Sequence, residues 1–376
     1  MRRIASIILL VVLCYVLALG SVIYFPIGPG QLGAFLTKLL HGQVRPLKVQ
    51  KKFNETICYV TDRKMGPRNG DNVSYLGEYA GAPSYGRINV QIPNDHSLAS
   101  PLGSDAVKKV EPLSSQDFVS VLQSQAAKPL IVWIHGYRAS FNKSTAHCAQ
   151  IAHDLNIDAN FLSFDWASSE SAFGYTRDVI QLKRSTKHLA NLLETIKNEV
   201  KPAKLVVIAH SLGTQLVCLA LQKLYNDPNA RDLKLDHVIF LAPNIDREDF
   251  DQNFKSQLQG FVKRLTIYVA ADDNALLLSK LLHNVDSIGL PEEFSPDTNL
   301  DEIQAFLYYG KDLPDKVDIV DLSFSKKEFL KHRVFLERPV LEDLFWLIKE
   351  DQPAATRHLL KYDGSKRATN YWVIPP

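Results

Sequence analysis

The sequence predicts an α/β fold in which a mostly parallel β-sheet carries helices on both faces. Short apolar runs alternate with helical stretches from about residue 114 onward, as parallel strands joined by crossover helices do. Several of these runs are continuously apolar, which is typical of strands buried on both faces. In such a sheet, ligands are expected beyond the carboxyl ends of the strands.

The expected strands of this sheet are six apolar runs, at residues 129–134, 160–166, 205–208, 238–242, 265–270 and 317–322. A helix is expected to begin near Ser114 or Ser115, and the longest helix spans about 175–200, where apolar residues form one stripe. Upstream, residues 57–63 and 84–93 are typical of two strands that add to an edge of the sheet.

This layout divides the chain into four parts. They are an apolar segment at 1–25, a linker with an N-terminal β segment that packs on the main domain at 26–115, the α/β domain at 116–350, and a C-terminal extension at 351–376. The hydrophobic content of 46% is ample for the core of a domain of this size.

The N-terminal apolar segment indicates contact with a membrane. After Arg2 and Arg3, residues 4–25 contain no charge, which is about the length that crosses a bilayer as a helix. A signal peptide cleaved near Gly20 is the alternative, but the apolar run continues beyond that point, which favours an uncleaved single-pass anchor. The basic pair before the run places the body outside the cytoplasm, although four basic residues within 45–52 favour the opposite orientation.

Composition argues against several other functions. Lys and Arg number 43 against 41 Asp and Glu, so the charge balance gives no sign of a nucleic-acid partner. The four cysteines have neither the spacing of metal ligands nor the density of a disulfide scaffold. We therefore expect no nucleic acid, no metal and no cofactor, and the sequence leaves the oligomeric state open.

Ser211 is the expected nucleophile. It follows an apolar run, stands two residues from Ala209 and from Gly213, and is followed at once by a helical pattern. This is the arrangement of a G-x-S-x-G nucleophile elbow, with alanine at the first position, in which small residues let strand and helix approach closely. The turn lifts the serine hydroxyl above the end of the sheet. His210, inside the elbow, is expected to point away from the hydroxyl and to be a packing residue.

A serine hydroxyl needs an imidazole to take its proton and a carboxylate to orient that imidazole. In the α/β-hydrolase order both partners follow the nucleophile, each on a loop after a later strand. Asp272 and Asp273 follow the fifth expected strand, and either could be the acid, with Asp246 after the fourth strand as a secondary candidate. His332 lies after the sixth, on the last loop of the expected sheet, and is the expected base.

Two backbone amides are expected to bind the oxyanion that forms when an ester carbonyl is attacked. Leu212 supplies one, directly after the nucleophile. Tyr137 supplies the other, because Gly136 follows the first expected strand of the core and lets the main chain turn its next amide toward the site.

These residues give the chain a resemblance to a family of α/β-hydrolases of unknown physiological role, found mostly in bacteria and known as DUF900. The resemblance rests on Val132-Trp-Ile-His-Gly-Tyr-Arg-Ala-Ser-Phe141, Phe164-Asp-Trp-Ala-Ser168, Tyr175 with Asp178, Ala209-His-Ser-Leu-Gly213, Tyr268-Val-Ala-Ala-Asp-Asp-Asn-Ala-Leu276, and His332 followed by Pro339-Val-Leu and Asp343-Leu344. Tyr59-Val-Thr-Asp-Arg63 is similar to an element that precedes this domain in many members, and its Asp-Arg pair is expected to be structural. The family's Gly-His and Trp-Pro-Ser are Lys331-His332 and Trp166-Ala167-Ser168 here.

The resemblance implies an α/β-hydrolase fold, and aligning the motif that begins at Tyr268 implies Asp273 rather than Asp272 as the acid. The expected protein is a membrane-tethered, esterase-like or lipase-like serine hydrolase that cleaves a carboxylic ester, small or lipid-like, through an acyl-enzyme. Its catalytic body is expected on the periplasmic side of a bacterial inner membrane, or secreted if the signal is cleaved. Alternatives are an acyltransferase on the same triad and a non-catalytic binding module, which the departure at Lys331 favours.

Two further apolar stretches, at 250–262 and 276–282, have two interpretations. They could form a cap over the site, or they could be helices that pack on the sheet. Their helical spacing favours packing on the sheet.

Overall fold

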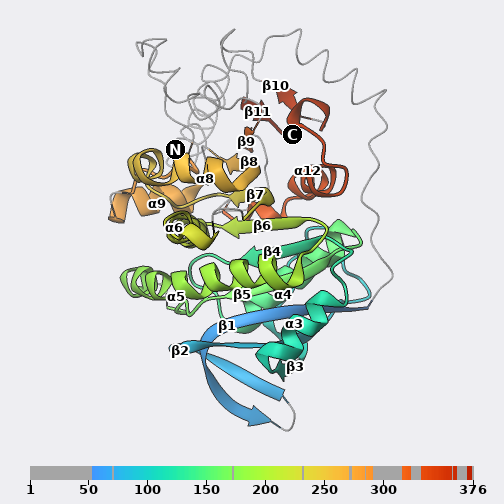
Figure 1. Ribbon diagram of the computed structural model, residues 1–376. Coiled ribbons are helices and arrows are strands. Elements are labelled where there is room, and N and C mark those ends of the chain that lie inside the picture. The colour runs from blue at the N-terminus through green and yellow to red at the C-terminus, as the bar shows by residue number, and fades with distance from the viewer. Residues whose placement is uncertain are drawn as a thin grey trace, which may run out of the picture.

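The computed structural model describes residues 53–69, 72–171, 173–230, 233–270, 273–283, 285–290, 316–322, 332–357, 359–361 and 371–374. Within them the predicted α/β architecture is confirmed, because helices cover both faces of one mostly parallel sheet (Figure 1). The expected anchor or signal peptide at 1–25, the linker at 26–52, Asp272 and Lys331 lie outside the described residues. None of the described helices is both long enough and apolar enough to cross a bilayer.

The described strands form one eleven-stranded sheet in the order β10-β11-β9-β8-β7-β6-β4-β5-β1-β2-β3. Neighbours from β11 to β1 pair in parallel, and the outer pairs β1–β2, β2–β3 and β10–β11 are antiparallel. In chain order the strands are β1 (Asn54–Asn69), β2 (Asn72–Gln91), β3 (Val107–Leu113), β4 (Leu130–Ile134), β5 (Asn160–Asp165), β6 (Leu205–His210), β7 (Leu235–Leu241), β8 (Val262–Val269), β9 (Val317–Asp321), β10 (Leu360–Lys361) and β11 (Tyr371–Val373).

The six expected core strands correspond to β4 through β9, and the largest boundary differences are at the starts of β7 and β8. The ladder between these two strands already begins at the pair Leu235 and Val262, three residues before each expected start. Polar residues such as Asp236 and Lys263 follow in both strands. Because their side chains reach solvent while the backbone continues the ladder, an apolar run alone underestimates the strand.

The expected end of the sheet at β9 is wrong. Strand β11 pairs in parallel with β9, and β10 pairs with β11, so the sheet continues by two positions and the segment that carries His332 is not its last connection. Strand β11 is only three residues long, and the hydroxyl of Tyr371 donates to Asp321 at 2.7 Å. So short a strand has too few residues to show a periodic pattern in the sequence.

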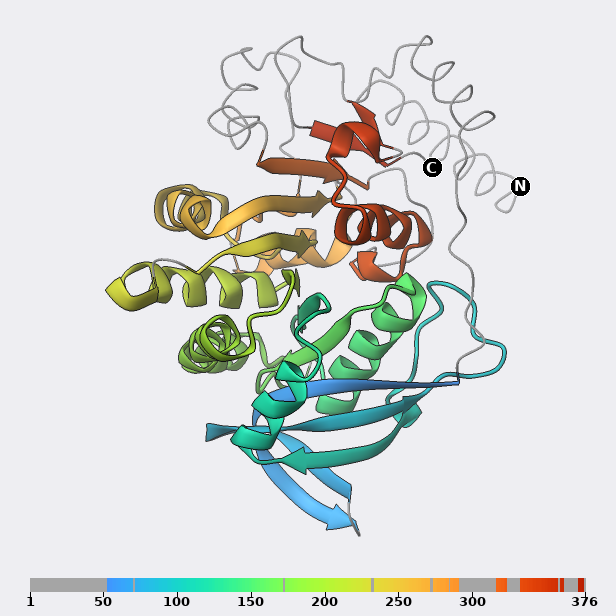
Figure 2. The same cartoon turned by 45° about the vertical axis from the view of Figure 1, so that its right-hand side comes forward.

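Two helical layers enclose the sheet (Figure 2). Apolar side chains of α3, α5, α6 and α8 form one buried cluster with one face of the sheet, and those of α4 and α12 form a second cluster with the other face. The α-helices are α3 (Ser115–Gln123), α4 (Phe141–Leu155), α5 (Tyr175–Thr195), α6 (Gly213–Tyr225), α7 (Arg247–Asp249), α8 (Lys255–Phe261), α9 (Asn274–His283) and α12 (Arg338–Lys349). Short helices of other types are η1 (Ser104–Ala106), η2 (Ile196–Val200), η3 (Pro228–Ala230), η4 (Phe250–Phe254), η5 (Val334–Leu336) and η6 (Ala354–Thr356).

The two apolar stretches that had two interpretations behave differently. In the first, Phe250, Phe254 and Leu258 are buried in the cluster that contains α6, so this stretch packs as expected. The second forms α9, where Leu276 is buried and Leu281 is 81% exposed. Helix α9 therefore packs through one side and presents apolar side chains on another.

Candidate active site

The carboxyl ends of three parallel strands bring the expected catalytic side chains together. Ser211 follows β6, Asp273 comes soon after β8, and His332 comes after β9. These strands lie within four consecutive positions of the sheet, β9-β8-β7-β6, and run in the same direction. The residues therefore meet at one edge although up to 121 positions separate them in the sequence.

Ser211 occupies the tight turn that the sequence predicts. Its φ angle of 52° is in the left-handed region, which residues other than glycine rarely adopt. A Cβ atom on Gly213 would overlap the carbonyl oxygen of His135, and one on Gly136 would lie 2.7 Å from the Cβ of Ser211. Glycine is required at both positions because the neighbouring backbone segments come too close for any side chain.

The three side chains form a continuous hydrogen-bonded series. His332 Nε2 lies 2.7 Å from the Oγ of Ser211, and His332 Nδ1 lies 2.8 Å from the Oδ2 of Asp273. The carboxylate can only accept from Nδ1, so in a neutral imidazole Nε2 is free to accept the serine proton. The imidazole is partly accessible, with 17% of its side chain exposed, whereas Asp273 is fully buried.

Asp273, the expected acid, lies directly before the first turn of α9. The second carboxylate oxygen of Asp273, Oδ1, accepts from the backbone N–H groups of Ala275 and Leu276, each at 3.0 Å. The positive end of the helix dipole at this turn favours a negative charge. The secondary candidate Asp246 instead caps α7 by accepting from the N–H of Asp249 at 3.2 Å.

The two expected oxyanion donors lie at neighbouring strand ends. Leu212 begins the turn into α6, and Tyr137 lies in the loop after β4. Neither backbone N–H donates to an acceptor among the described residues. The loop after β4 is held at the expected donor and at the next residue, because the Tyr137 hydroxyl donates to Ser171 O at 2.8 Å and the Arg138 N–H donates to Ser168 Oγ at 2.9 Å.

Arg63, a buried residue of β1, binds the loop that follows β4. Arg63 Nε donates to Asp165 at 2.6 Å, Nη1 to Ser168 O at 2.8 Å and Nη2 to Ala139 O at 2.7 Å. Burial alone would raise the pKa of the Asp165 carboxyl, but the charges and hydrogen bonds of Arg63 and His135 together outweigh it and hold that pKa below its ordinary value. The guanidinium thus fixes the loops after β4 and β5 together, in agreement with the structural role expected for the Asp62-Arg63 pair.

His210 does more than pack. Its ring stacks on Trp133, as a packing residue would, but its Nε2 also lies 2.8 Å from the backbone oxygen of His332. The sequence carried no signal for this contact, because the partner is a main-chain atom far along the chain.

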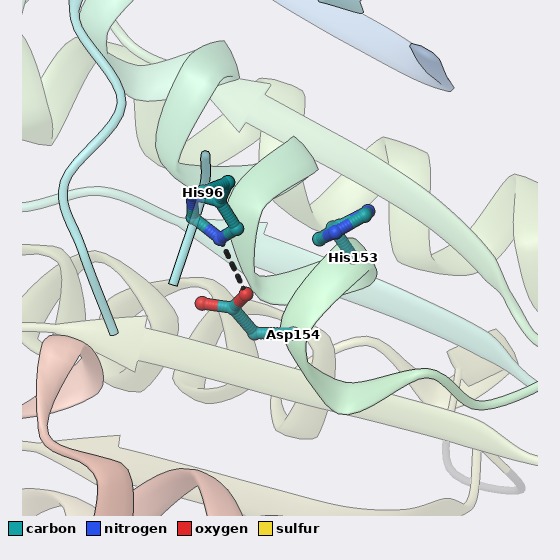
Figure 3. Close-up of side chains that lie close together, drawn as sticks. All are labelled: His96, His153 and Asp154. Atoms are coloured by element: carbon teal, nitrogen blue, oxygen red, sulfur yellow. Dashed lines mark hydrogen bonds and ion pairs between the residues drawn. The ribbon is translucent and has the colours of Figure 1, made fainter. Parts of the chain in front are cut away.

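A second group of ligand-type side chains lies at the end of α4 and in the loop after β2. His96, His153 and Asp154 are buried, and each offers a nitrogen or oxygen within 4.8 Å of the others (Figure 3). His96 Nε2 binds Asp154 Oδ1 at 2.7 Å, the N–H of Ala99 donates to Asp154 Oδ2 at 3.1 Å, and His153 Nδ1 lies 3.3 Å from Glu55. These bonds occupy the Asp154 carboxylate and tie β1 and the loop after β2 to the end of α4. We therefore interpret the group as a latch between these elements.

Comparison with known proteins gives distant matches. The chain is 24% identical over 217 residues to the uncharacterized protein alr1448 of Nostoc sp., a match that covers 43% of this chain and 56% of that protein. This chain therefore matches little more than half the length of that relative. Among solved structures, an esterase of Pyrobaculum calidifontis is 12% identical with a TM-score of 0.38, covering 85% of this chain and 92% of that chain. One of two fungal esterases from Rhizomucor miehei is 12% identical with a TM-score of 0.40, covering 86% and 97%.

At these scores the solved structures bear on neither substrate nor mechanism. The family described as alpha/beta hydrolase of unknown function (DUF900), in contrast, matches residues 111–350, which is more than half of the chain. The matched region includes all three residues of the hydrogen-bonded series. The chain therefore belongs to the DUF900 family of α/β-hydrolases, as the sequence motifs predicted.

Proposed function

We propose that this protein is a serine hydrolase that cleaves carboxylic esters through an acyl-enzyme. The observation that carries the proposal is the series of two hydrogen bonds from Ser211 through His332 to Asp273, at 2.7 and 2.8 Å. In a Ser-His-Asp triad, nucleophilic catalysis by serine uses this order of hydroxyl, imidazole and carboxylate. The left-handed turn at Ser211 supports the same role, because strained backbone at a nucleophile is a feature of such elbows.

In the acylation half, Ser211 Oγ attacks the ester carbonyl carbon while His332 Nε2 takes the hydroxyl proton. The carbonyl oxygen becomes an oxyanion that accepts from the backbone N–H groups of Tyr137 and Leu212. Asp273 accepts from Nδ1 throughout, which keeps the imidazole in the required tautomer and stabilises its charged form. The tetrahedral intermediate then releases the alcohol, which leaves with the proton from Nε2, and the acyl group stays on Oγ.

In the deacylation half, water takes the place of the alcohol. His332 Nε2 removes a proton from the water as its oxygen attacks the acyl carbon, and the same two amides bind the second oxyanion. Collapse breaks the bond to Ser211 Oγ, which recovers its proton from Nε2. The products are a carboxylic acid and an alcohol, and the enzyme returns to its starting state.

We further propose a lipid-like ester as the substrate and a membrane tether as its setting. Residues 4–25 carry no charge, which suits a single-pass anchor with the catalytic body on the periplasmic side of a bacterial inner membrane. If a peptidase removes this segment, the body would be periplasmic or secreted. Helix α9, whose first turn binds Asp273, leaves Leu277 and Leu281 39% and 81% exposed on one side, and such apolar surface suits an acyl chain.

The proposal is tested on the full chain in detergent with a fluorophosphonate probe and a panel of esters of graded acyl length. We expect the wild type to be labelled and Ser211→Ala to remain unlabelled, with ester turnover reduced roughly 10⁴-fold or more. Equal labelling of the two proteins would refute the role of Ser211. A loss of less than about tenfold in His332→Ala would indicate a binding module on a hydrolase scaffold. Capture of the acyl group by an added alcohol in preference to water would indicate an acyltransferase.

A further inference from the structure

We propose that His210, the residue before the nucleophile, is a positioning residue that holds the main chain of the catalytic base. Its ring Nε2 lies 2.8 Å from the carbonyl oxygen of His332. The carbonyl can only accept, so Nε2 carries the hydrogen and donates it. This inference rests on the proposed function, because it concerns the same nucleophile and the same base.

The hydrogen bond from His210 links the strand end that carries the nucleophile to the main chain of the catalytic base. His210 ends β6 and Ser211 follows it directly, so one strand end supplies both the hydroxyl and the donor that holds its base. The base itself lies between β9 and the short helix η5, outside any helix or strand. Among the described residues no helix or strand includes the main chain at His332, so the bond from His210, together with that from Asp273 to the ring, sets how far the ring lies from the serine.

The His210 ring is itself held in one orientation. It stacks on Trp133 with centroids 6.4 Å apart and 12° between the planes, and it meets the edge of Phe335 at 4.9 Å and 76°. Phe335 also contacts Trp133 at 5.0 Å, which completes an aromatic cluster. The Nδ1 edge of the ring is packed against Gly136, because a Cβ on that glycine would lie only 2.9 Å from His210 Nδ1. A ring confined in this way can aim its Nε2–H at a single acceptor.

The charge state of the ring suits this task. Burial lowers the pKa of His210 well below its ordinary value, and charge on the nearby His332 ring, 4.7 Å away between centroids, lowers it further. The other titratable rings that act in the same direction are those of His147 and His135. A neutral His210 therefore donates from Nε2 without placing a second positive charge beside the imidazolium that forms during catalysis.

Two substitutions separate positioning from packing. His210→Phe keeps an aromatic ring for Trp133 and Phe335 but removes the donor, whereas His210→Gln removes the ring and keeps an N–H donor at the end of a side chain of similar reach. If His210 positions the base, Phe lowers kcat about 10- to 100-fold with little change in KM, because small misplacements of catalytic groups have effects of this size. Gln then restores kcat to within about fivefold of the wild type at a lower melting temperature.

The experiment measures kcat and KM on a short-chain p-nitrophenyl ester, together with thermal unfolding, for the full chain in detergent. The inference is overturned if His210→Phe turns over like the wild type while His210→Gln is the impaired variant, because that pattern belongs to packing alone. It is also overturned if both variants lose activity in proportion to their loss of folded protein.

A second measurement does not depend on turnover and so separates this inference from the proposed function. A downfield proton resonance is expected for the Nδ1–H of His332 bound to Asp273, assigned by its loss in His332→Ala. We expect this resonance to shift or broaden in His210→Phe and to stay in place in His210→Gln. An unchanged resonance in His210→Phe overturns the inference even if the protein hydrolyses esters. A changed resonance in a protein that hydrolyses none supports the positioning of His332 and refutes only the proposed activity.

Discussion

Replacing Arg63 by methionine tests whether the loop that carries Tyr137 depends on a buried charge from β1. The substitution keeps much of the side-chain volume but leaves Asp165 buried without its cation. Removing one partner of a buried pair costs about 3–5 kcal/mol. Asp165 would keep two donors, Thr61 Oγ1 at 2.7 Å and His135 Nε2 at 3.1 Å, which favours the lower half of this range.

The two carbonyl oxygens that Arg63 binds, those of Ser168 and Ala139, add to the loss because each gives up a charged donor. We therefore expect Arg63→Met to lower the free energy of unfolding by about 4 kcal/mol in total. A protein of ordinary stability tolerates this loss and still folds. Turnover per folded molecule should fall about 100-fold, because the loop that presents the Tyr137 amide would lose its support.

The neighbouring residue provides a matched control. Lys64 pairs with Glu78 at 3.3 Å, but both side chains are more than half exposed, so Lys64→Met should cost less than about 1 kcal/mol. The assay is urea unfolding followed by tryptophan fluorescence near neutral pH, with kcat measured on the same preparations. The reasoning is wrong if the two variants lose equal stability, or if Arg63→Met is destabilised but retains full turnover per folded molecule.

The pH dependence of the Arg63 effect has a definite sign. The pKa of Asp165 is held below 3.8 in the folded protein, so its ion pair stabilises the fold above the pH at which the unfolded carboxyl ionises. That contribution is lost as pH falls through the folded pKa. The stability difference between the wild type and Arg63→Met should therefore shrink in strong acid.

Three further predictions concern other sites. Asp273→Asn should lower kcat about 10⁴-fold with little change in KM, whereas Asp246→Asn should lower the melting temperature and leave kcat intact; the reverse result would assign the acid to Asp246. Burial lowers the pKa of His237 from 6.5 to about 4 despite its contact with Asp351 at 2.8 Å, so protonation favours the unfolded chain. Unfolding free energy should therefore fall as pH decreases from about 6.5 to about 4, and His237→Gln should flatten this slope. For the latch of His96, His153 and Asp154, a chelator should leave thermal unfolding unchanged while His96→Ala lowers the melting temperature; a drop on chelation alone would identify a metal centre instead.

The sequence was most informative where one local pattern determines the structure. Buried strands have to be apolar on both faces, so the cores of β4 to β9 were visible as runs, and the elbow at Ser211 was visible because Gly213 has no alternative there. Because parallel strands bring their carboxyl ends to one edge, His332 and the pair Asp272 and Asp273 could be placed near the nucleophile, and the resemblance to the family then selected Asp273.

Contacts to main-chain atoms were not visible in the sequence. The bond from His210 ends on a carbonyl oxygen 122 positions away, and any residue presents the same carbonyl there. The same holds for Arg63, which binds the carbonyls of Ala139 and Ser168. Every residue type has the same backbone carbonyl, so a hydrogen bond to a carbonyl does not restrict which residue stands there. Such contacts are visible only in the structure.

Arg63 lies before residues 111–350, the region that matches the family, and a second buried arginine lies after it. Arg357 is fully buried and pairs with Asp343 at 3.2 Å and with Asp318 at 3.3 Å, both of them inside the matched region. Without the flanking segments, Asp165 at one end of the sheet and this pair of carboxylates at the other would each lose a buried cation. An uncompensated buried charge costs several kcal/mol, which is a large part of the net stability of a domain. We therefore expect the matched region alone to be less stable than the full chain, and β1 and the segment around Arg357 to unfold together with the active site.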